Sequence, residues 1–288
     1  MTAHNLFAKL ERMRESDVKS YIAGMNDLST IPILLAKIIR TCNDPNSGPQ
    51  DIFNLITYDP ALAERIMRIA NSVFFGHSGE IKNLYQAIMF LGIERIKSLA
   101  LGMTVLNALP TKGTTTATNL WVHSYEVAYV ASSLAKYIPR LLTGDCFLCG
   151  LLHDVGRIVF FGMNPEKFRQ LSASDGILEQ ERAAFGCEHM VSGMMLLDKI
   201  GMPHELIAPI RYHHTPLASP ESPNLVAAVA LAEALLGLRK SRPEEDGGWS
   251  NEHDALVKRL NLSEYILEAA YDELIDSRSE IEGIFTSA

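Results

Sequence analysis

The chain has 288 residues, of which 47% are hydrophobic and 21% are charged, a composition that supports a packed core and argues against disorder. Its net charge of -8 disfavours non-specific binding to nucleic acid, which requires a basic surface. We find no uninterrupted apolar run of about 18 residues, and residues 1–10 lack the basic start and apolar core of a signal peptide. We therefore expect a cytoplasmic protein without membrane insertion.

Helical spacing of apolar residues dominates the first half of the chain. Asp59 is expected to cap a helix that begins at Pro60, because aspartate accepts hydrogen bonds from first-turn N–H groups and proline fits the first helical position. The predicted helices lie at residues 1–28, 33–39, 50–56, 60–70, 84–91 and 93–109. No alternating strand pattern interrupts them, which predicts an all-α fold, a multi-helix bundle.

A polar, threonine-rich segment from Pro110 to Thr118 is the predicted linker to the second half. Further helices are expected at residues 120–137, before His153, and at 165–185, 190–200, 207–212 and 225–238, followed by amphipathic peripheral helices. Glu179, Glu181 and Arg182 are expected to face solvent. The predicted units are an N-terminal helical part (1–112), a helical subdomain (119–240) and a C-terminal extension (250–288).

The stretch from Asp145 to Arg157 carries the clearest signal of a functional site. Its apolar run ends at His153 and Asp154, and Gly156 follows two residues later. Adjacent helical residues point about 100° apart, so both side chains can converge on one ion. Imidazole nitrogen and carboxylate oxygen suit transition metals, including iron and manganese. The alternative is a capping aspartate beside a hydrogen-bonded core histidine.

Two cysteines within this stretch, Cys146 and Cys149, form a CxxC pair. A zinc site would need a second cysteine pair, and a redox motif would follow a strand. We interpret both residues as small, buried, reduced hydrophobes.

Other polar residues of the second half also allow two interpretations. His189 could start a helix and bond a backbone carbonyl. His213 could cap the preceding helix and leave His214 exposed. Glu233 stands alone in the apolar segment 225–238, and a buried carboxylate is costly unless it is paired. It therefore needs a metal ion, a histidine or an arginine nearby.

Several short motifs are spaced across residues 25–235. They are Ile31-Pro32, Asp44-Pro45, Asp59-Pro60-Ala61-Leu62, Ala70-Asn71-Ser72, Gln86-Ala87-Ile88 with Leu91-Gly92, Trp121-Val122-His123-Ser124, the run from Gly150 to Gly156, Glu181 with Gly186 and His189, Pro203, and His213-His214. This set resembles the HDOD domain, a bacterial signalling module related to the HD phosphohydrolases. The resemblance implies an all-α fold with an HD-like helical bundle, and a role in regulation more than in catalysis.

The resemblance also implies a set of metal ligands. The first histidine of the HD phosphohydrolases corresponds to His123, and their doublet corresponds to His153 and Asp154. Additional ligands of related phosphodiesterases correspond to His189, His213 and His214. The late aspartate of the family is replaced by Glu233. The implied ion is divalent iron, manganese or zinc.

Two further departures weaken the resemblance to active hydrolases. Arg157 stands where a lysine often follows the doublet, and Thr215-Pro216-Leu217 replaces the Gly-Tyr-Pro element of cyclic-di-GMP hydrolases. We therefore favour a signal-transduction module that binds a partner protein or a small nucleotide and keeps a residual metal or phosphate site. The alternative is a metal-dependent phosphohydrolase with Asp154 as candidate catalytic residue. Self-association is left open.

Overall fold

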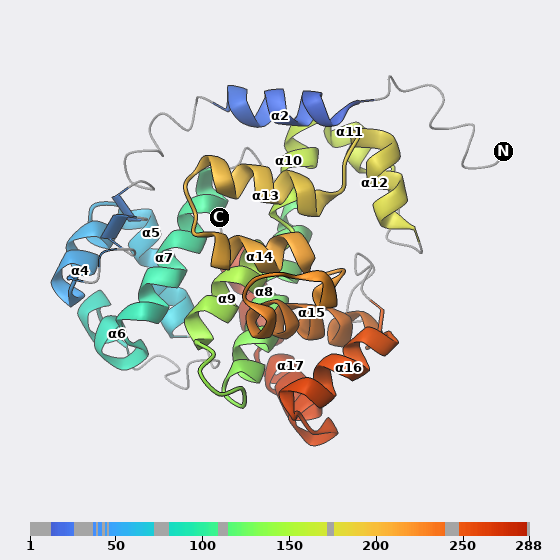
Figure 1. Cartoon of the computed structure of the whole chain (residues 1–288). Coiled ribbons are helices and arrows are strands. Elements are labelled where there is room, and N and C mark those ends of the chain that lie inside the picture. Colours follow the sequence, from blue (N-terminus) through green and yellow to red (C-terminus); the bar gives the residue numbers. More distant parts are fainter. Residues whose placement is uncertain are drawn as a thin grey trace.

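The computed structural model describes residues 13–25, 37–38, 40–41, 44, 46–71, 81–108, 115–171, 176–239 and 248–286. Within these ranges the chain is helical and contains no strand, so the all-α prediction is confirmed. Figure 1 places helices α4 to α7 at one side of the molecule, α8, α9, α14 and α15 near its centre, α10 to α13 above them, and α16 and α17 at the opposite lower corner. Helix α2 (Glu15–Gly24) lies across α13.

The first group of helices packs around apolar side chains. It consists of α4 (Pro49–Thr57), α5 (Pro60–Ala70), α6 (Leu84–Leu91) and α7 (Ile93–Ala108). Asp59 caps α5 as predicted, because its side chain accepts hydrogen bonds from the backbone N–H groups of Ala61 and Leu62. Asn71 ends this helix, and its amide exchanges two hydrogen bonds with the backbone of Ile81. Both polar residues therefore have structural roles.

Helix α8 (Thr115–Ala135) is the axis of the second group. Every residue from Leu120 to Ala135 is buried, as expected for a helix that is covered on all sides. It packs against α9 (Thr143–Leu152), α15 (Pro223–Leu238) and α17 (Glu264–Thr286). Helix α9 also packs against α7, so the two groups of helices share a continuous apolar core.

The remaining helices surround the junction between α9 and α10. They are α10 (Val155–Met163), α11 (Pro165–Phe168), α12 (Ile177–Phe185), α13 (His189–Lys199) and α14 (His204–Tyr212), with a 3-10 turn at Pro216–Ala218 and the peripheral helix α16 (Asn251–Leu260). Two glycines allow close packing here. A Cβ atom on Gly150 would lie 2.5 Å from Cα of Ala128, and one on Gly156 would lie 1.9 Å from the carbonyl oxygen of His189. Larger side chains would separate the helices that carry the polar cluster described below.

Several boundaries differ from the sequence predictions. Thr115 to Thr118 are helical, so the end of the predicted linker belongs to α8, whereas residues 109–114 lie outside the described part. The predicted helix 165–185 is two helices, α11 and α12. Residues 1–12 and 26–36, which cover most of the first two predicted helices, also lie outside the described ranges.

The apolar stretch Thr143–Met163 corrects the expectation that the sequence holds no segment long enough to cross a membrane. Length and composition alone would allow it to do so, but 89% of its apolar window is buried in the fold. The chain also turns at His153 and Asp154, between α9 and α10. These are the properties of a core segment. Helix α17, expected to be peripheral, contacts α8 through a hydrogen bond from Ser133 Oγ to Glu273 Oε2.

Candidate metal centre

The predicted doublet lies at the turn that joins two buried helices. His153 is the residue after the last turn of α9, and Asp154 is the residue before the first turn of α10. Both side chains are fully buried. Because the chain changes direction here, the imidazole and the carboxylate face the same interior space, where His153 Nε2 lies 3.6 Å from Asp154 Oδ2.

Three imidazoles are held in the same way, by their Nδ1 atoms. His153 Nδ1 lies 2.7 Å from the Gly150 carbonyl oxygen, and His213 Nδ1 lies 3.0 Å from that of Ile210. His189 Nδ1 lies 2.7 Å from Glu181 Oε2. Each of these partners is an acceptor, so Nδ1 carries the proton and Nε2 presents its lone pair to the interior. This is the arrangement of metal-binding histidines.

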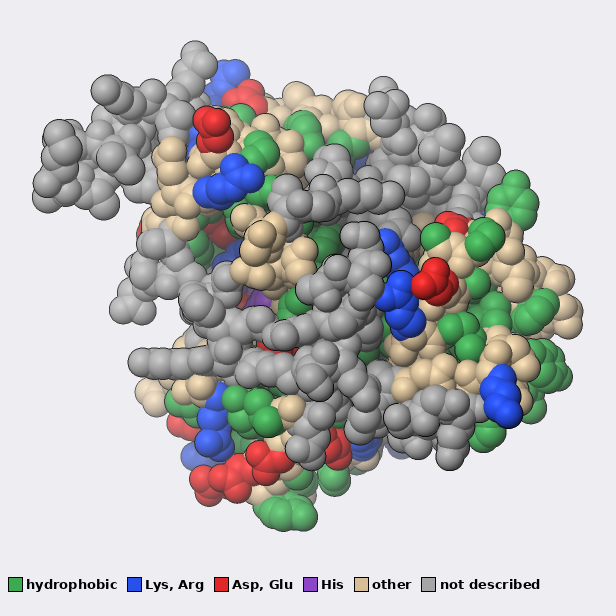
Figure 2. Space-filling view, turned by 180° about the vertical axis from the view of Figure 1, so that it is seen from behind, with side chains coloured by type: hydrophobic (Ala, Val, Ile, Leu, Met, Phe, Trp, Pro, Cys, Tyr) green, Lys and Arg blue, Asp and Glu red, His purple; other side chains and the backbone are tan. Residues whose placement is uncertain are grey.

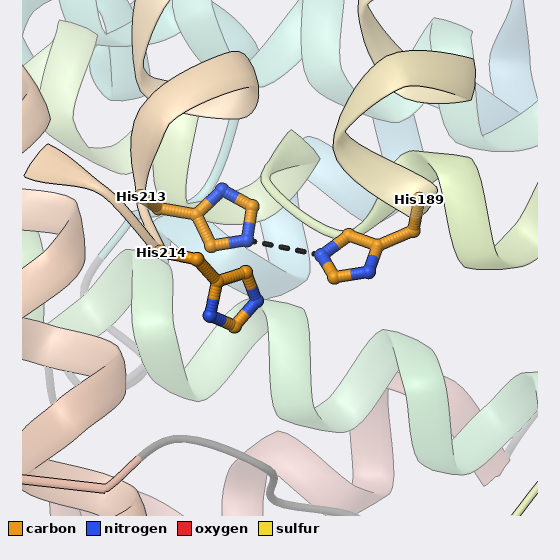
Figure 3. Close-up of side chains that lie close together, drawn as sticks. All are labelled: His189, His213 and His214. Carbon is orange, nitrogen blue, oxygen red and sulfur yellow. Dashed lines mark hydrogen bonds between the residues drawn. The ribbon is translucent and has the colours of Figure 1, made fainter. Parts of the chain in front are cut away.

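The Nε2 atoms and the carboxylate oxygens converge. The two Nε2 atoms of His189 and His213 are 3.1 Å apart, as drawn in Figure 3, and His189 Nε2 is 3.2 Å from Asp154 Oδ1. Ligands at about 2.1 Å from one ion are separated by about 3.0 Å at right angles and about 3.4 Å in a tetrahedron. The two separations that involve His189 match these values. Neighbouring donor atoms among His153, Asp154, His213 and Glu233 lie 3.6–4.0 Å apart and would move slightly closer around an ion. The donor types and their convergence suit a transition metal.

Glu233 and the other histidines complete the cluster. Glu233 Oε2 lies 3.8 Å from His213 Nε2, and Oε1 lies 3.9 Å from His153 Nε2 and 3.8 Å from His214 Nε2. The buried carboxylate thus has the histidine neighbours that its position required. His123 Nε2 lies 3.9 Å from Asp154 Oδ2, at the other side of the doublet.

All seven predicted site residues therefore lie in one region of the structure. The donor atoms of six of them form two compact sets that share His213, and within each set the atoms lie within 4.8 Å of one another. One set is His189, His213 and His214, and the other is His153, Asp154, His213 and Glu233. His123 belongs to neither set, although it contacts the carboxylate that anchors the second one.

The sequence analysis did not identify two charged residues at the centre of the structure, Glu181 and Arg157, as site residues. Glu181, expected to face solvent, is fully buried, and its carboxylate accepts hydrogen bonds from the backbone and ring of His189 and from Arg157 Nε. Arg157 also donates from Nη1 to Asp154 Oδ2 at 2.9 Å. The spacing of Glu181, Gly186 and His189 was the available signal, since it belongs to the motifs that support the resemblance.

Electrostatics of the cluster favour ionised carboxylates. Burial alone would raise the pKa of Asp154, but Arg157 and the surrounding imidazoles hold it well below its usual range. Burial would likewise raise the pKa of Glu181, which His189 and Arg157 lower. The pKa of His153 falls to about 4, mainly through burial, so its imidazole is neutral at pH 7 and able to ligate a metal.

His189 has the opposite tendency. Burial would lower its pKa, but the charge of Glu181 raises it. Without a metal, an imidazolium at this position can donate to Glu181 through Nδ1 and to Asp154 through Nε2. A metal ion would replace the Nε2 proton and satisfy the same acceptors, so metal binding should release a proton.

Access to the cluster is narrow. His153, Asp154 and His189 have no exposed surface, whereas the side chain of His214 is 14% exposed. In Figure 2, histidine appears as one small patch of the visible face. At the centre, His153 Nε2 has no hydrogen-bond partner among the described residues, and Asp154 Oδ1 has only the 3.2 Å contact with His189 Nε2. A buried cation would satisfy both.

Comparison with known proteins identifies the matched region. The family model of the HDOD domain matches residues 28–216. An uncharacterised protein of Treponema pallidum is 29% identical over 217 residues, which are 72% of this chain and 42% of that protein. The chain thus spans less than half the length of this curated relative.

Solved structures share the fold. A Geobacter sulfurreducens HDOD domain protein with unknown function is 20% identical and superposes with a TM-score of 0.71, covering 93% of this chain and 99% of that one. A Marinobacter aquaeolei protein whose name proposes a role in signal transduction gives 0.72 at 24% identity, over 93% and 64% of the two chains. A Shewanella amazonensis protein whose name proposes phosphohydrolase activity gives 0.71 at 19%, over 92% and 98%.

Proposed function

This chain belongs to the HDOD family, and we propose that it is a signal-transduction module whose HD-type centre binds a divalent iron, manganese or zinc ion. His153, Asp154, His213 and Glu233 would hold the ion, with His189 beside it. When bound, the ion supplies a positive charge that fixes the positions of α10, α13, α14 and α15 relative to one another. Metal occupancy would thus set the surface that a partner protein or a small nucleotide recognises.

The observation that carries this proposal is the shared orientation of three buried imidazoles. Nδ1 of His153, His189 and His213 faces an acceptor, so the Nε2 lone pairs meet each other and two carboxylates. Without a cation, the 3.1 Å contact between His189 and His213 would bring two lone pairs together. Either a proton or a metal ion is needed there, and only a metal ion can satisfy the whole set.

The burial of the cluster favours a regulatory role over turnover. A hydrolytic metal site keeps an open position for substrate, whereas the central residues here have no exposed surface. Phosphoester hydrolysis is the second candidate, because the partly exposed His214 gives the cluster one side near solvent. In that case Arg157 would orient Asp154, and Asp154 would hold the ion that polarises the phosphoryl group.

Metal binding is tested by elemental analysis of the purified protein, followed by calorimetric titration of chelator-treated protein with Zn²⁺ and Mn²⁺. We expect about one ion per chain and release of a proton when binding is measured near neutral pH. His213→Gln should abolish stoichiometric binding. His204→Gln is the matched control, since His204 is an exposed histidine at the other end of α14.

The outcome against the proposal is a metal-free protein in which His213→Gln and His204→Gln titrate like the parent. Turnover is tested separately with bis-p-nitrophenyl phosphate on metal-loaded protein. Hydrolysis that Asp154→Asn abolishes, while the variant remains folded, would replace the regulatory role by the hydrolase.

A further inference from the structure

A cavity lies beside the proposed metal centre and contains none of its proposed ligands. Its volume is about 320 Å³, within the usual range for small-molecule sites. It is partly open to solvent and is lined by the start of α8, by α10, by α11 with the residues that follow it, and by α12.

The lining separates into a polar and an apolar part. Two guanidinium groups, the buried Arg157 and the exposed Arg169, are accompanied by the hydroxyls of Thr115 and Thr116. The carboxylate of Glu181 is engaged by Arg157 and His189. Guanidinium and hydroxyl donors together suit a phosphate or a carboxylate.

Apolar side chains form the rest of the wall. Leu120, Phe168, Leu171 and Ile177 line the same cavity. They suit a flat or aliphatic body attached to the anionic group, since burial of that body would add affinity. Two helices also begin at this cavity, α8 at Thr115 and α12 at Ile177, and their first turns add positive potential to that of the arginines.

We propose that this cavity binds a small molecule in which a phosphate or carboxylate is attached to an apolar body, and that Arg157 couples its binding to the metal centre. Arg157 lines the cavity and also donates to Asp154, while Glu181 lines it and holds His189. Arg157 and Glu181 thus lie between the cavity and two members of the cluster, Asp154 and His189.

The direction of coupling follows from charge. A divalent ion beside Asp154 would weaken the attraction between Asp154 and Arg157, and the guanidinium would then favour an anion in the cavity. Metal and anion should therefore bind more tightly together than alone, and each should affect the other by the same factor. This coupling rests on the proposed metal centre, whereas occupation of the cavity does not.

Phenylphosphonate is a suitable probe, because its carbon–phosphorus bond resists hydrolysis. Calorimetry on the chelator-treated 288-residue chain should give an affinity for phenylphosphonate about tenfold higher than for methylphosphonate, which lacks the apolar body. Arg169→Gln should weaken phenylphosphonate binding about fivefold. Arg140→Gln removes the same charge at an exposed position outside the cavity and should change binding less than about twofold.

Equal affinities for the two phosphonates, or equal effects of the two arginine substitutions, would overturn the site. The same titration on Mn²⁺-loaded protein tests the coupling, and we expect tighter binding that still depends on Arg169. Unchanged affinity on protein that demonstrably holds Mn²⁺ would overturn the coupling. Binding to metal-free protein that never takes up Mn²⁺ would support the cavity and contradict the proposed metal centre, so the two failures are distinguishable.

Discussion

The two groups of helices place their polar residues differently. In α4 to α7, Asp59 and Asn71 sit at helix ends, and the interior is predominantly apolar, with Lys97 as the one buried charged side chain among the described residues. In α8 to α15, eight ionisable groups are buried together at the centre. They are His123, His153, Asp154, Arg157, Glu181, His189, His213 and Glu233.

This difference separates a framework from a site. Apolar packing tolerates changes in pH and metal concentration, whereas buried charges are costly unless each has a partner. The second group therefore depends on Arg157, on protons and, in our account, on a metal ion. Helix α7 packs against α9, so the first group supports the helix that carries His153.

The largest expected effect is that of Asp154→Ala. It removes the carboxylate that faces four imidazoles and leaves Arg157 without its 2.9 Å partner. We expect the free energy of unfolding to fall by about 3–5 kcal/mol, measured by urea denaturation. A loss of about 0.5 kcal/mol or less would contradict the ionised state of this carboxylate.

The next largest loss of stability is expected for Gly156→Ala. The added Cβ atom would overlap the His189 carbonyl oxygen, so α13 must move away from α10. We expect a loss of about 3 kcal/mol and weaker metal binding, because His189 moves with its helix. Gly24→Ala is the matched control, since no atom lies within 4 Å of its added Cβ. Similar stabilities of the two variants would show that the close contact is unimportant.

Mild acid should destabilise the metal-free protein. His153 has a folded pKa of about 4 against an ordinary value of 6.5, so the unfolded chain binds more protons between these values and stability falls as the pH falls from 6.5. Burial and the neighbouring histidines lower the pKa of His213, so His213 acts in the same direction. The pKa of His189 is raised, so His189 has the opposite effect.

At pH 5 the contribution of His153 amounts to about 2 kcal/mol relative to pH 7. Urea denaturation in the presence of a chelator at both pH values measures the total. Hydrogen exchange locates the effect, which we expect in α9, α10 and α13 before α5 and α6. Equal denaturation midpoints at pH 7 and pH 5 would contradict the neutral, buried state of His153.

The smallest effect is expected in the first group. Asp59→Ala removes the cap of α5 and should cost about 1 kcal/mol. Metal binding should be unchanged, since this residue lies outside the cluster. Comparison of its zinc titration with that of the parent provides the check. Loss of stoichiometric binding would instead mean that the framework and the site are not separable.

Much of the fold was predictable from local signals, whereas the set of candidate metal ligands was implied by the resemblance to the family. The Asp59-Pro60 cap and the apolar run before His153 are properties of neighbouring residues, and the structure contains both. The isolated Glu233 in an apolar segment correctly indicated a buried partner.

The charged residues that contact the candidate ligands were not predictable in this way. The amphipathic pattern around Glu181 also suits an exposed carboxylate, and only tertiary packing brings it to Arg157 and His189. The alternative in which the His189 ring bonds a backbone carbonyl is wrong for the same reason, because its Nδ1 atom contacts Glu181 Oε2 instead. Likewise, the burial of both His213 and His189 against one another depends on the approach of α13 to α14.

X-ray absorption spectroscopy at the metal edge of the purified protein is the most direct test of the central claim. We predict nitrogen and oxygen ligands at about 2.0–2.2 Å and the outer-shell scattering of two or more imidazoles, reduced in His213→Gln. Sulfur ligands, or a spectrum without imidazole scattering, would contradict a centre built from His153, Asp154, His213 and Glu233.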